Sequence, residues 1–300
     1  MKTAMSMNTM FKTIFALGAA VFIGASNSAA APLRILAATN DLAAIARAVA
    51  GPSAEIKVVA RPDRDLHSLE VRPSMMTMAA KADVYLAVGL SLDLWSEGIV
   101  QGSRNTKLKV ITCSEAVQPL EVPAGKVDAS MGDVHPYGNP HYWLDPENAV
   151  LIAQDLATRF TALDAAQAGM YEANAEAFAK QIEQRIPAWR ERLQNKSFVE
   201  YHRMWVYAAQ RFGMEIAGQV EPLPGIPPTG QHLASLAATI REKHVPVVIR
   251  DLFHPEDPVE FLQRETGTRA AVVSASCDEP TPESYFQTFD RLADALNGKS

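Results

Sequence analysis

Three of the seven histidines in this chain lie near the carboxyl ends of predicted strands or in the loops that follow them. His67 lies in the loop after residues 56–60, His141 lies in a loop just before a helix, and His202 directly follows a strand that ends at Tyr201. Ligands of open α/β sheets bind at this edge. Imidazole is the commonest side chain for binding borderline metals such as zinc. The pattern therefore predicts a transition-metal site, while each histidine taken alone is also compatible with an ordinary surface residue.

A fourth ligand is expected because zinc prefers four ligands in a tetrahedron, drawn from nitrogen, sulfur and carboxylate oxygen. Asp278, in the segment Ser276-Cys277-Asp278-Glu279, again follows a predicted strand. Its carboxylate is therefore the candidate for the fourth position. Histidines from separate loops surround one ion only if the loops face each other, so the elements that hold these loops decide whether the site exists.

Strand-like apolar runs alternate with helical patterns in the first part of the chain. The predicted strands are residues 33–38, 56–60, 84–88 and 108–112, and the predicted helices are residues 41–49 and 73–81. Pro73 suits the first position of a helix, where its missing N–H is not needed. This alternation favours a parallel sheet that is covered by helices on both faces.

A long helical pattern over residues 165–194 interrupts the alternation. Apolar residues recur there at helical spacing, and Pro187 predicts a kink or a helix end. Alternation then resumes, with predicted strands at 197–201, 215–218, 247–249 and 270–273 and helices at 204–212, 232–243, 258–266 and 282–297. We therefore predict an α/β fold of two Rossmann-like βα lobes, residues 31–164 and 195–300, joined by a long α-helix.

The first thirty residues have the pattern of a signal peptide. Lys2 and Lys12 form a basic segment, an apolar run covers residues 15–23, and Ser28-Ala29-Ala30 offers small residues before a predicted cut after Ala30. The apolar run is about half of the roughly 20 residues that a membrane-spanning helix needs. We predict export to the periplasm with no stable membrane anchor, and the absence of a Cys near the cut gives no indication of a lipid anchor.

The charge and the cysteines limit the function further. The formal net charge of −6 becomes −8 once Lys2 and Lys12 leave with the signal peptide. An acidic exported chain without a basic cluster is a poor candidate for binding nucleic acid. Cys113 and Cys277 lie far apart in the sequence, so only the fold decides whether they pair.

Four stretches resemble, in the same order, motifs of the zinc- and manganese-binding solute-binding proteins of ABC importers. They are Arg61-Pro62-Asp63-Arg64-Asp65-Leu66-His67, Asn139-Pro140-His141-Tyr142-Trp143-Leu144-Asp145-Pro146, Tyr201-His202 with the helix that follows, and Glu221-Pro222-Leu223-Pro224-Gly225. The resemblance covers about residues 32–297. It implies two βα lobes with a rigid linking helix and a metal in the cleft between the lobes. It also implies that His67, His141 and His202 bind this metal.

The resemblance fixes the fourth ligand less firmly. It places an Asp after the last strand of the second lobe, which matches Asp278, while Cys277, Glu279 or a water remain alternatives. Three imidazoles with at most one carboxylate favour Zn(II) over the harder manganese ion, although copper, nickel and cobalt also suit such a site. The implied function is high-affinity capture of Zn(II), or alternatively of manganese or another divalent metal. The implied partners of a monomeric receptor are the membrane permease and the ATPase of an ABC importer.

The loop before the second ligand departs from many zinc-type relatives, in which it is long and rich in histidine. Here residues 123–138 contain a single histidine, His135, and three glycines that predict a mobile loop. We hypothesise that His135 is an auxiliary metal-capture residue; the alternative is an exposed loop histidine. Asp65 and Asp145 are candidate hydrogen-bond partners of the ligating imidazoles, and Asp145 is equally suited to cap a helix.

A secreted zinc hydrolase is the rival function, because three histidines with one open position form a catalytic zinc site. The sequence contains neither an HExxH helix nor a GxSxG turn, so we predict that the protein is not an enzyme. The remaining histidines are His232, His244 and His254. We interpret the first two as surface or helix-end residues, and His254, which has carboxylate neighbours, as a candidate for a peripheral metal contact.

Overall fold

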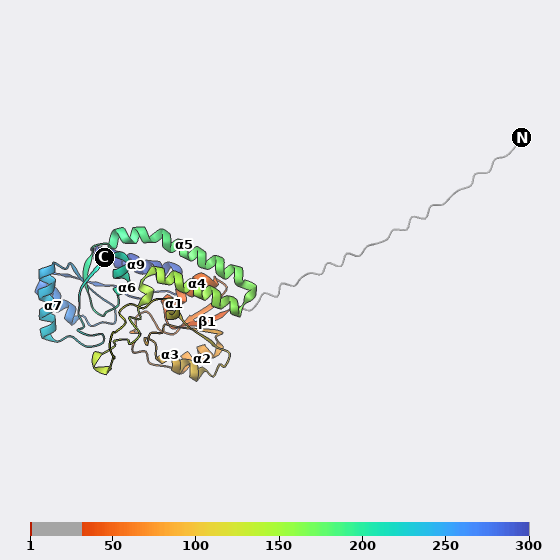
Figure 1. Ribbon diagram of the computed structural model, residues 1–300, viewed down its shortest axis with the longest axis horizontal. Coiled ribbons are helices and arrows are strands. Elements are labelled where there is room, and N and C mark those ends of the chain that lie inside the picture. The colour runs from red at the N-terminus through yellow and green to blue at the C-terminus, as the bar shows by residue number, and fades with distance from the viewer. Residues whose placement is uncertain (2–31, 300) are drawn as a thin grey trace. The chain divides into compact units, whose positions relative to one another are not determined.

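The computed structural model describes Met1 and residues 32–299. The predicted signal peptide therefore lies outside the described residues, apart from Met1. From Pro32 onward the chain forms one compact unit, in which two α/β lobes are joined by a long helix (Figure 1). None of the helices in the described residues combines the length and the apolar character needed to cross a membrane.

The first lobe contains a four-stranded parallel sheet with the strand order β2-β1-β3-β4. The strands are β1 (Arg34–Ala37), β2 (Glu55–Val58), β3 (Val84–Ala87) and β4 (Lys109–Thr112). The helices are α1 (Asn40–Ala50), α2 (Pro73–Lys81) and α3 (Trp95–Ser103). Every residue of β3 is buried, which is the pattern of a parallel strand with both faces covered.

The second lobe repeats this topology with the strand order β6-β5-β7-β8. Its strands are β5 (Ser197–Glu200), β6 (Glu215–Gln219), β7 (Val247–Arg250) and β8 (Arg269–Val272). Its helices are α6 (Val206–Phe212), α7 (Gly230–Lys243), α8 (Asp257–Thr266) and α9 (Pro282–Leu296). Since the strands of both sheets are parallel, the loops that follow them gather at one edge of each sheet.

Two long helices, α4 (Pro146–Leu163) and α5 (Ala168–Leu193), pack against each other along the lobes (Figure 1). α5 also contacts α1 of the first lobe and α6 and α9 of the second lobe. One hydrophobic core runs through these elements and includes Ile45 of α1, Phe178 of α5 and Phe289 of α9. The lobes are therefore joined through a shared core as well as through the chain.

Pro187 lies inside α5, and the helix continues past it to Leu193 rather than ending there. Trp189, two residues after the proline, is buried, and its ring centroid lies 4.9 Å from that of Phe289. Tertiary packing of this kind compensates for the helix hydrogen bond that a proline removes. Of the expected kink or helix end, the helix end is thus wrong, whereas the long helix itself is confirmed.

The predicted strands agree with the eight observed strands to within two residues at each end. α3 was not expected, because Gly98 and Gly102 lower its helix propensity. Burial of Ile99 stabilises this helix instead. The predicted lobe limits at residues 164 and 195 remain predictions.

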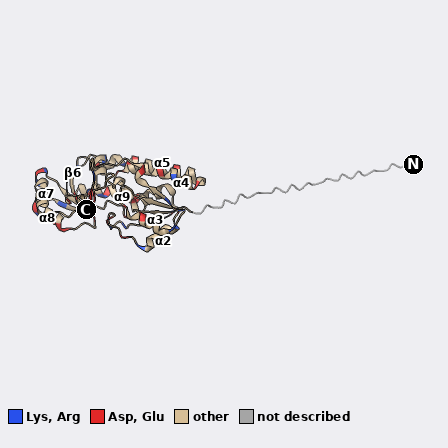
Figure 2. Cartoon of the chain, turned by 60° about the horizontal axis from the view of Figure 1, so that its bottom comes forward, with Lys and Arg blue, Asp and Glu red and all other residues tan. Residues whose placement is uncertain are grey.

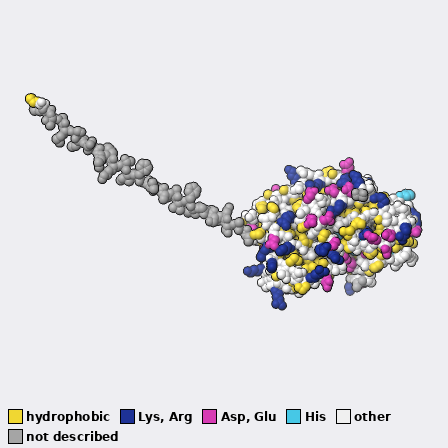
Figure 3. Space-filling model, turned by 180° about the vertical axis from the view of Figure 1, so that it is seen from behind, with side chains coloured by type: hydrophobic (Ala, Val, Ile, Leu, Met, Phe, Trp, Pro, Cys, Tyr) yellow, Lys and Arg dark blue, Asp and Glu magenta, His cyan; other side chains and the backbone are white. Residues whose placement is uncertain are grey.

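Short 3₁₀ helices and a mixed surface complete the fold. The 3₁₀ helices are Cys113–Ala116, Ala129–Met131, Tyr142–Leu144 and Ala165–Gln167. Basic and acidic residues are interspersed along the helices in Figure 2, and their side chains are interspersed over the face seen in Figure 3. The parts of the described surface seen in these views therefore show no field of a single sign.

Candidate metal centre

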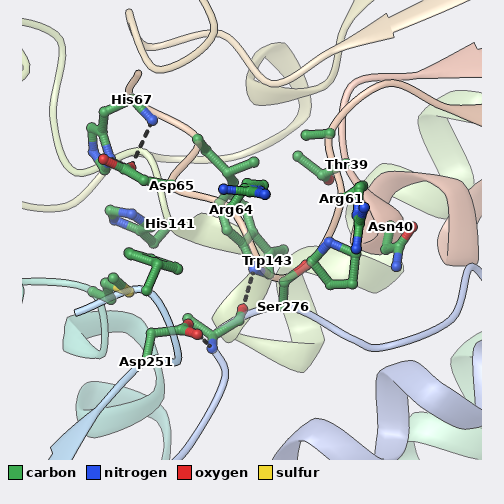
Figure 4. Close-up of a pocket in the computed structure, with 16 residues that line it drawn as sticks. Thr39, Asn40, Arg61, Arg64, Asp65, His67, His141, Trp143, Asp251 and Ser276 are labelled. Carbon is green, nitrogen blue, oxygen red and sulfur yellow. Dashed lines mark hydrogen bonds and ion pairs between the residues drawn. The ribbon is translucent and has the colours of Figure 1, made fainter. Parts of the chain in front are cut away.

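The three predicted histidines come together between the lobes. His67 lies in the loop between β2 and α2, His141 directly precedes the 3₁₀ helix Tyr142–Leu144, and His202 follows β5. One ligand atom from each residue lies within 4.8 Å of those from the other two. His141 and His202 are buried, and the His67 side chain is 10% exposed. Figure 4 shows His67 and His141 on one side of a cavity, with His67 paired to Asp65.

The distances between the rings suit one shared metal ion. The ring centroid of His67 lies 4.9 Å from that of His202 and 5.6 Å from that of His141, and the centroids of His141 and His202 are 5.7 Å apart. Tetrahedral zinc with Zn–N bonds of about 2.0–2.1 Å places imidazole centroids about 5 Å apart. Small side-chain movements therefore suffice for all three rings to bind one ion.

The same local motif orients two of the three imidazoles. Asp65 Oδ1 accepts hydrogen bonds from the backbone N (2.9 Å) and Nδ1 (2.8 Å) of His67, two residues later. Asn139 Oδ1 accepts the equivalent bonds from His141, at 3.0 and 2.9 Å. Because an oxygen acceptor at Nδ1 fixes the imidazole proton there, the Nε2 lone pair of each ring is free to bind a metal.

A residue distant in sequence orients the third imidazole. Glu221 Oε2 lies 2.7 Å from Nδ1 of His202 and also accepts a hydrogen bond from the backbone N of Gly225 at 2.9 Å. The proton of His202 is therefore on Nδ1, as in the other two rings. All three histidines thus present Nε2 as the available ligand atom.

His254 forms a second cluster of candidate ligands with His202 and Glu221. However, Nδ1 of His254 accepts a hydrogen bond from the backbone N of Asp251 at 3.1 Å. In the neutral ring this places the proton on Nε2, so neither nitrogen has a free lone pair for a metal. The ring stacks on Tyr201, with centroids 4.3 Å apart. His254 is therefore a packing residue beside His202 rather than a ligand.

The environment of the site lowers the pKa of one imidazole, His141, and of one carboxyl, Asp65. Burial, together with the nearby His67 and His202, holds the pKa of His141 well below its usual value of 6.5. Burial alone would raise the pKa of the Asp65 carboxyl, but its hydrogen bond and charge interaction with His67 hold that pKa below the usual 3.8. The His141 ring is thus held neutral, with a free nitrogen for a metal, and the Asp65 carboxylate is held as an anion beside His67.

Apolar side chains surround this polar group. Leu66, Trp143, Met204 and Phe253 line the cavity beside His67 and His141. Trp143 is held in place by a 2.8 Å hydrogen bond from its Nε1 to the carbonyl oxygen of Ala275. Walls of this kind limit the access of water and strengthen electrostatic interactions with a bound cation.

Asp278 is not brought to the three histidines. Its side chain is 64% exposed and pairs with Arg291, with Nη1 and Oδ2 2.9 Å apart. Its backbone carbonyl accepts a hydrogen bond from Asn40 Nδ2 at 2.8 Å, which holds the loop in place, and its carboxylate belongs to neither cluster of candidate ligands among the described residues. This corrects the prediction that Asp278 supplies the fourth ligand. Among the described residues, Cys277 and Glu279 are likewise absent from both clusters of candidate ligands.

The ring of His135 is partly buried beside His67, although neighbouring residues of its loop are exposed. Its ring centroid is 5.3 Å from that of His67, and its Nε2 atom is buried without a hydrogen-bond partner. Burial and the neighbouring His67 and His202 lower its pKa to about 4. The interpretation of His135 as an exposed loop histidine is therefore wrong.

Asp145 caps a helix and does not contact an imidazole. Its Oδ1 accepts a hydrogen bond from the backbone N of Glu147 at 2.9 Å, at the start of α4. Both of its carboxylate oxygens also accept hydrogen bonds from the Arg211 guanidinium, each at 2.8 Å. Of the two predicted roles, the N-cap is thus confirmed, with an additional ion pair to α6 of the second lobe.

Sequence reasoning missed two residues that hold the site in place. Glu221 was noted only as part of a motif, since its partner is 19 residues away. Glu200 is fully buried at the end of β5 and accepts hydrogen bonds from the backbone N atoms of Met204 (3.1 Å) and Trp205 (2.9 Å), which fixes the turn around His202. Burial raises the pKa of Glu200 to about 7. The sequence signal that could have identified Glu200 is a charged residue at the end of an apolar strand.

The remaining histidines and the two cysteines lie outside the metal centre. His232 Nε2 is 3.0 Å from the carbonyl oxygen of Gln219, and His244 caps the C-terminus of α7. Cys113 and Cys277 are both buried and free, so they do not pair with each other.

The whole described unit also matches known proteins. A family model described as "ZnuA: Zinc-uptake complex component A periplasmic" matches residues 35–298. The chain belongs to this family. A crystal structure of ZnuA superposes with a TM-score of 0.77 at 20% identity, over 88% of this chain and 99% of that chain, which confirms the two-lobe fold.

Relatives of this ZnuA-family chain are named for several metals. The iron-binding protein YfeA of Yersinia pestis is 25% identical over 267 residues, which are 84% of this chain and 81% of that protein. The manganese ABC transporter substrate-binding lipoprotein PsaA of Streptococcus pneumoniae is 22% identical and aligns over 91% of each chain. Members of this family are extracytoplasmic metal-binding transport proteins, so this ZnuA-family chain captures a metal ion for an ABC importer, as predicted. These names do not distinguish zinc from the other metals.

Proposed function

We propose that this protein captures Zn(II) in the periplasm and delivers it to the permease and ATPase of its importer. The proposed ligands are the Nε2 atoms of His67, His141 and His202. The observation that supports this role is their convergence: an oxygen acceptor holds each Nδ1, while one ligand atom from each ring lies within 4.8 Å of the others.

Zinc is proposed over manganese because the inner ligands are nitrogens. Asp65 and Glu221, the carboxylates nearest the rings, accept the Nδ1 protons of His67 and His202. Imidazole ligands suit zinc, nickel and copper, whereas manganese prefers carboxylate, carbonyl and water oxygens. The names of the manganese- and iron-type relatives define the alternative, a receptor for another divalent metal.

Delivery follows from the origin of the ligands in both lobes. His67 and His141 belong to loops of the first lobe, whereas His202 follows β5 of the second lobe. A small displacement of one lobe against the other separates His202 from the other two imidazoles and removes one of the three nitrogens. We propose that docking on the permease causes this displacement and releases the ion.

Two further parts of the proposal concern the mature chain. The signal peptide is cut after Ala30, and N-terminal sequencing of the exported protein tests this position. The mature chain functions as a monomer, and sedimentation velocity with and without zinc tests this state. A dimer that forms only with bound metal would contradict the second part.

Metal competition tests the central proposal. Metal-free protein is titrated with Zn(II), Mn(II), Fe(II) and Ni(II) against a coloured chelator. The expected result is tighter binding of Zn(II) than of Mn(II), and a loss of at least about 100-fold in Zn(II) affinity for His67→Ala, His141→Ala or His202→Ala, the upper end of the cost of losing a ligand's hydrogen-bond partner. His232→Ala, a histidine outside the cluster, is the matched control. Tighter binding of Mn(II), or variants that bind like the control, would overturn the proposal.

A further inference from the structure

Two buried imidazole nitrogens without partners face the same small region. Among the described residues, the only buried side-chain N or O atoms that lack a hydrogen-bond partner are His67 Nε2, His135 Nε2 and Ser197 Oγ. Leaving a buried polar atom unpaired costs about 1–3 kcal/mol, so native structures avoid it unless another group satisfies the atom. His67 Nε2 is a proposed zinc ligand, which suggests that the adjacent nitrogen of His135 serves the same ion.

The position of His135 is that of an incomplete fourth ligand. Its ring centroid is 5.3 Å from that of His67, close to the roughly 5 Å expected between imidazoles on tetrahedral zinc. It does not belong to the group whose ligand atoms all lie within 4.8 Å of one another, which contains only His67, His141 and His202. A movement of the His135 ring toward the other two imidazoles would complete the tetrahedron.

The segment that holds His135 belongs to the first lobe and is seated on a loop of the second lobe. We call residues 121–138 the lid and residues 221–226 the lid seat. The backbone N of Asp133 donates a 2.8 Å hydrogen bond to the carbonyl oxygen of Pro224. Gly132 has a φ of +68°, and a Cβ added there would lie 2.2 Å from the same oxygen. Only glycine therefore permits this close approach, two and three residues before His135.

The lid seat also holds the third ligand in place. Glu221 is its first residue and accepts hydrogen bonds from Nδ1 of His202 and from the backbone N of Gly225. Gly225 in turn lies against the Asp133 carboxylate, which an added Cβ would approach to 2.1 Å. Closure of the lid and orientation of His202 thus depend on the same short loop.

We propose that His135 is the fourth metal ligand: the lid, held on the lid seat, keeps its ring beside His67, and a movement of the ring brings Nε2 to the ion. This inference rests on the proposed function, since it concerns the same ion. It assigns the protein a site of four imidazoles and no carboxylate ligand. Such a site discriminates more strongly against Mn(II) than three imidazoles with one carboxylate. Only one of the four ligands lies on the lid. Movement of the lid therefore opens the metal site without unfolding either lobe.

Counting the bound imidazoles tests the ligand set directly. Protein labelled with ¹⁵N-histidine is titrated with Zn(II), and the ring-nitrogen resonances are recorded for the wild type and for His135→Ala. The expected result is four rings whose Nε2 resonances shift to metal-bound positions in the wild type and three in the variant. Three shifted rings in the wild type, with His135 unaffected, would overturn this inference and leave the three-histidine site intact. No shifted ring at all would instead contradict the proposed function.

Affinity and dissociation test the role of the lid. His135→Ala should weaken Zn(II) binding by about 10- to 100-fold and raise the dissociation rate, while Mn(II) binding changes less. His232→Ala, at a histidine outside both the lid and the clusters of candidate ligands, is the matched control and should bind like the wild type. Gly132→Ala should weaken binding similarly, because it displaces the lid from its seat.

The double variant separates a ligand role from a general effect on stability. If His135 acts through lid closure, Gly132→Ala combined with His135→Ala should bind little more weakly than either single variant, since both remove the same interaction. Urea unfolding of the metal-free proteins checks that each variant folds. Additive losses of affinity, or equal weakening of Zn(II) and Mn(II) binding by His135→Ala, would overturn the inference.

Discussion

Nδ1 of His202 lies 2.7 Å from Oε2 of Glu221, and the same carboxylate oxygen accepts the backbone N–H of Gly225 at 2.9 Å. This single oxygen therefore fixes both the tautomer of a proposed metal ligand and the path of the loop against which the lid packs. The His67–Asp65 and His141–Asn139 pairs use oxygens only two residues away. The second lobe thus links its ligand to a distant loop, whereas the first lobe orients its ligands locally.

Removing this oxygen should weaken metal binding without removing a ligand. We expect Glu221→Ala to lower Zn(II) affinity by about 10- to 100-fold, because His202 loses the acceptor that orients its ring and raises its basicity. Glu221→Gln should lose less, since its amide oxygen still accepts the Nδ1 proton but has no charge. Competition titration with a chelator measures both values.

Glu215→Ala is the control for Glu221. Glu215 lies on the neighbouring strand, where its exposed carboxylate pairs only with Lys243 at 2.8 Å. Its removal should leave Zn(II) affinity unchanged. Equal affinities for wild type, Glu221→Ala and Glu215→Ala would show that the His202–Glu221 pair has no part in binding.

Much of the fold could be predicted from the sequence because its strands are short, apolar and separated by clear turn signals. Val84–Ala87 is entirely buried and was recognised as a strand from its composition. α3 was not predicted from the sequence. A helix that contains Gly98 and Gly102 depends on tertiary contacts for its stability, and a local sequence pattern does not show those contacts. The helix end predicted at Pro187 was wrong for the same reason, because buried neighbours keep α5 helical around the proline.

The site was predictable where its residues act locally. His67 and His141 each have an oxygen-bearing side chain two residues earlier, Asp65 and Asn139, and this spacing could have identified both tautomers. The fourth position could not be predicted in the same way. Whether Asp278 or His135 lies beside the three histidines depends on which way two loops turn, and hydrogen bonds to residues far away in sequence decide this.

Asp278 should be dispensable for metal binding. Its carboxylate faces solvent and pairs with Arg291, so we expect Asp278→Ala to keep the Zn(II) affinity of the wild type within about twofold, as for other exposed ion pairs. The same titration with His67→Ala provides the positive control for a lost ligand. A tenfold or greater loss in Asp278→Ala would show that the loop after β8 turns inward when metal binds.

Asp41 should make the stability of the metal-free protein depend on pH. Its carboxylate is fully buried at the start of α1 and accepts hydrogen bonds from Ser276 Oγ and from the backbone N of Cys277, across the two lobes. Burial raises its pKa from 3.8 to about 6. The folded state therefore binds this proton more tightly than the unfolded state. The contribution of protonated Asp41 to the free energy of unfolding is greatest below pH 3.8 and is lost as the pH rises through about 6.

Asp41→Asn isolates this effect, because the amide keeps the shape, accepts from the backbone N of Cys277 through its oxygen and donates to Ser276 Oγ through its nitrogen, but does not titrate. A pKa difference of this size corresponds to about 3 kcal/mol. We expect the stability of the variant relative to the wild type to increase by roughly this amount between pH 4 and pH 7. Urea unfolding of both metal-free proteins at several pH values measures it. A difference between them that does not change with pH would contradict the raised pKa.

The Asp145–Arg211 pair should matter for stability more than for metal binding. Asp145 caps α4 and accepts two 2.8 Å hydrogen bonds from the guanidinium of Arg211 on α6. Its replacement by alanine removes a helix cap, worth about 1 kcal/mol, and leaves a half-buried arginine without its main partner, which costs about 1–3 kcal/mol more. We therefore expect Asp145→Ala to lower the free energy of unfolding by about 2–4 kcal/mol.

Asp155→Ala separates this effect from that of an ordinary surface charge. Asp155 also pairs with an arginine at 2.8 Å, but its partner Arg159 lies one turn away on the same helix and is 36% exposed. Such a pair contributes about 0.3–0.5 kcal/mol, so the control should unfold almost like the wild type. Because Asp145 contacts no imidazole, metal-loaded Asp145→Ala should keep its Zn(II) affinity within a few-fold. A large loss of affinity with little loss of stability would instead show that the link between α4 and α6 controls the separation of His141 from His202.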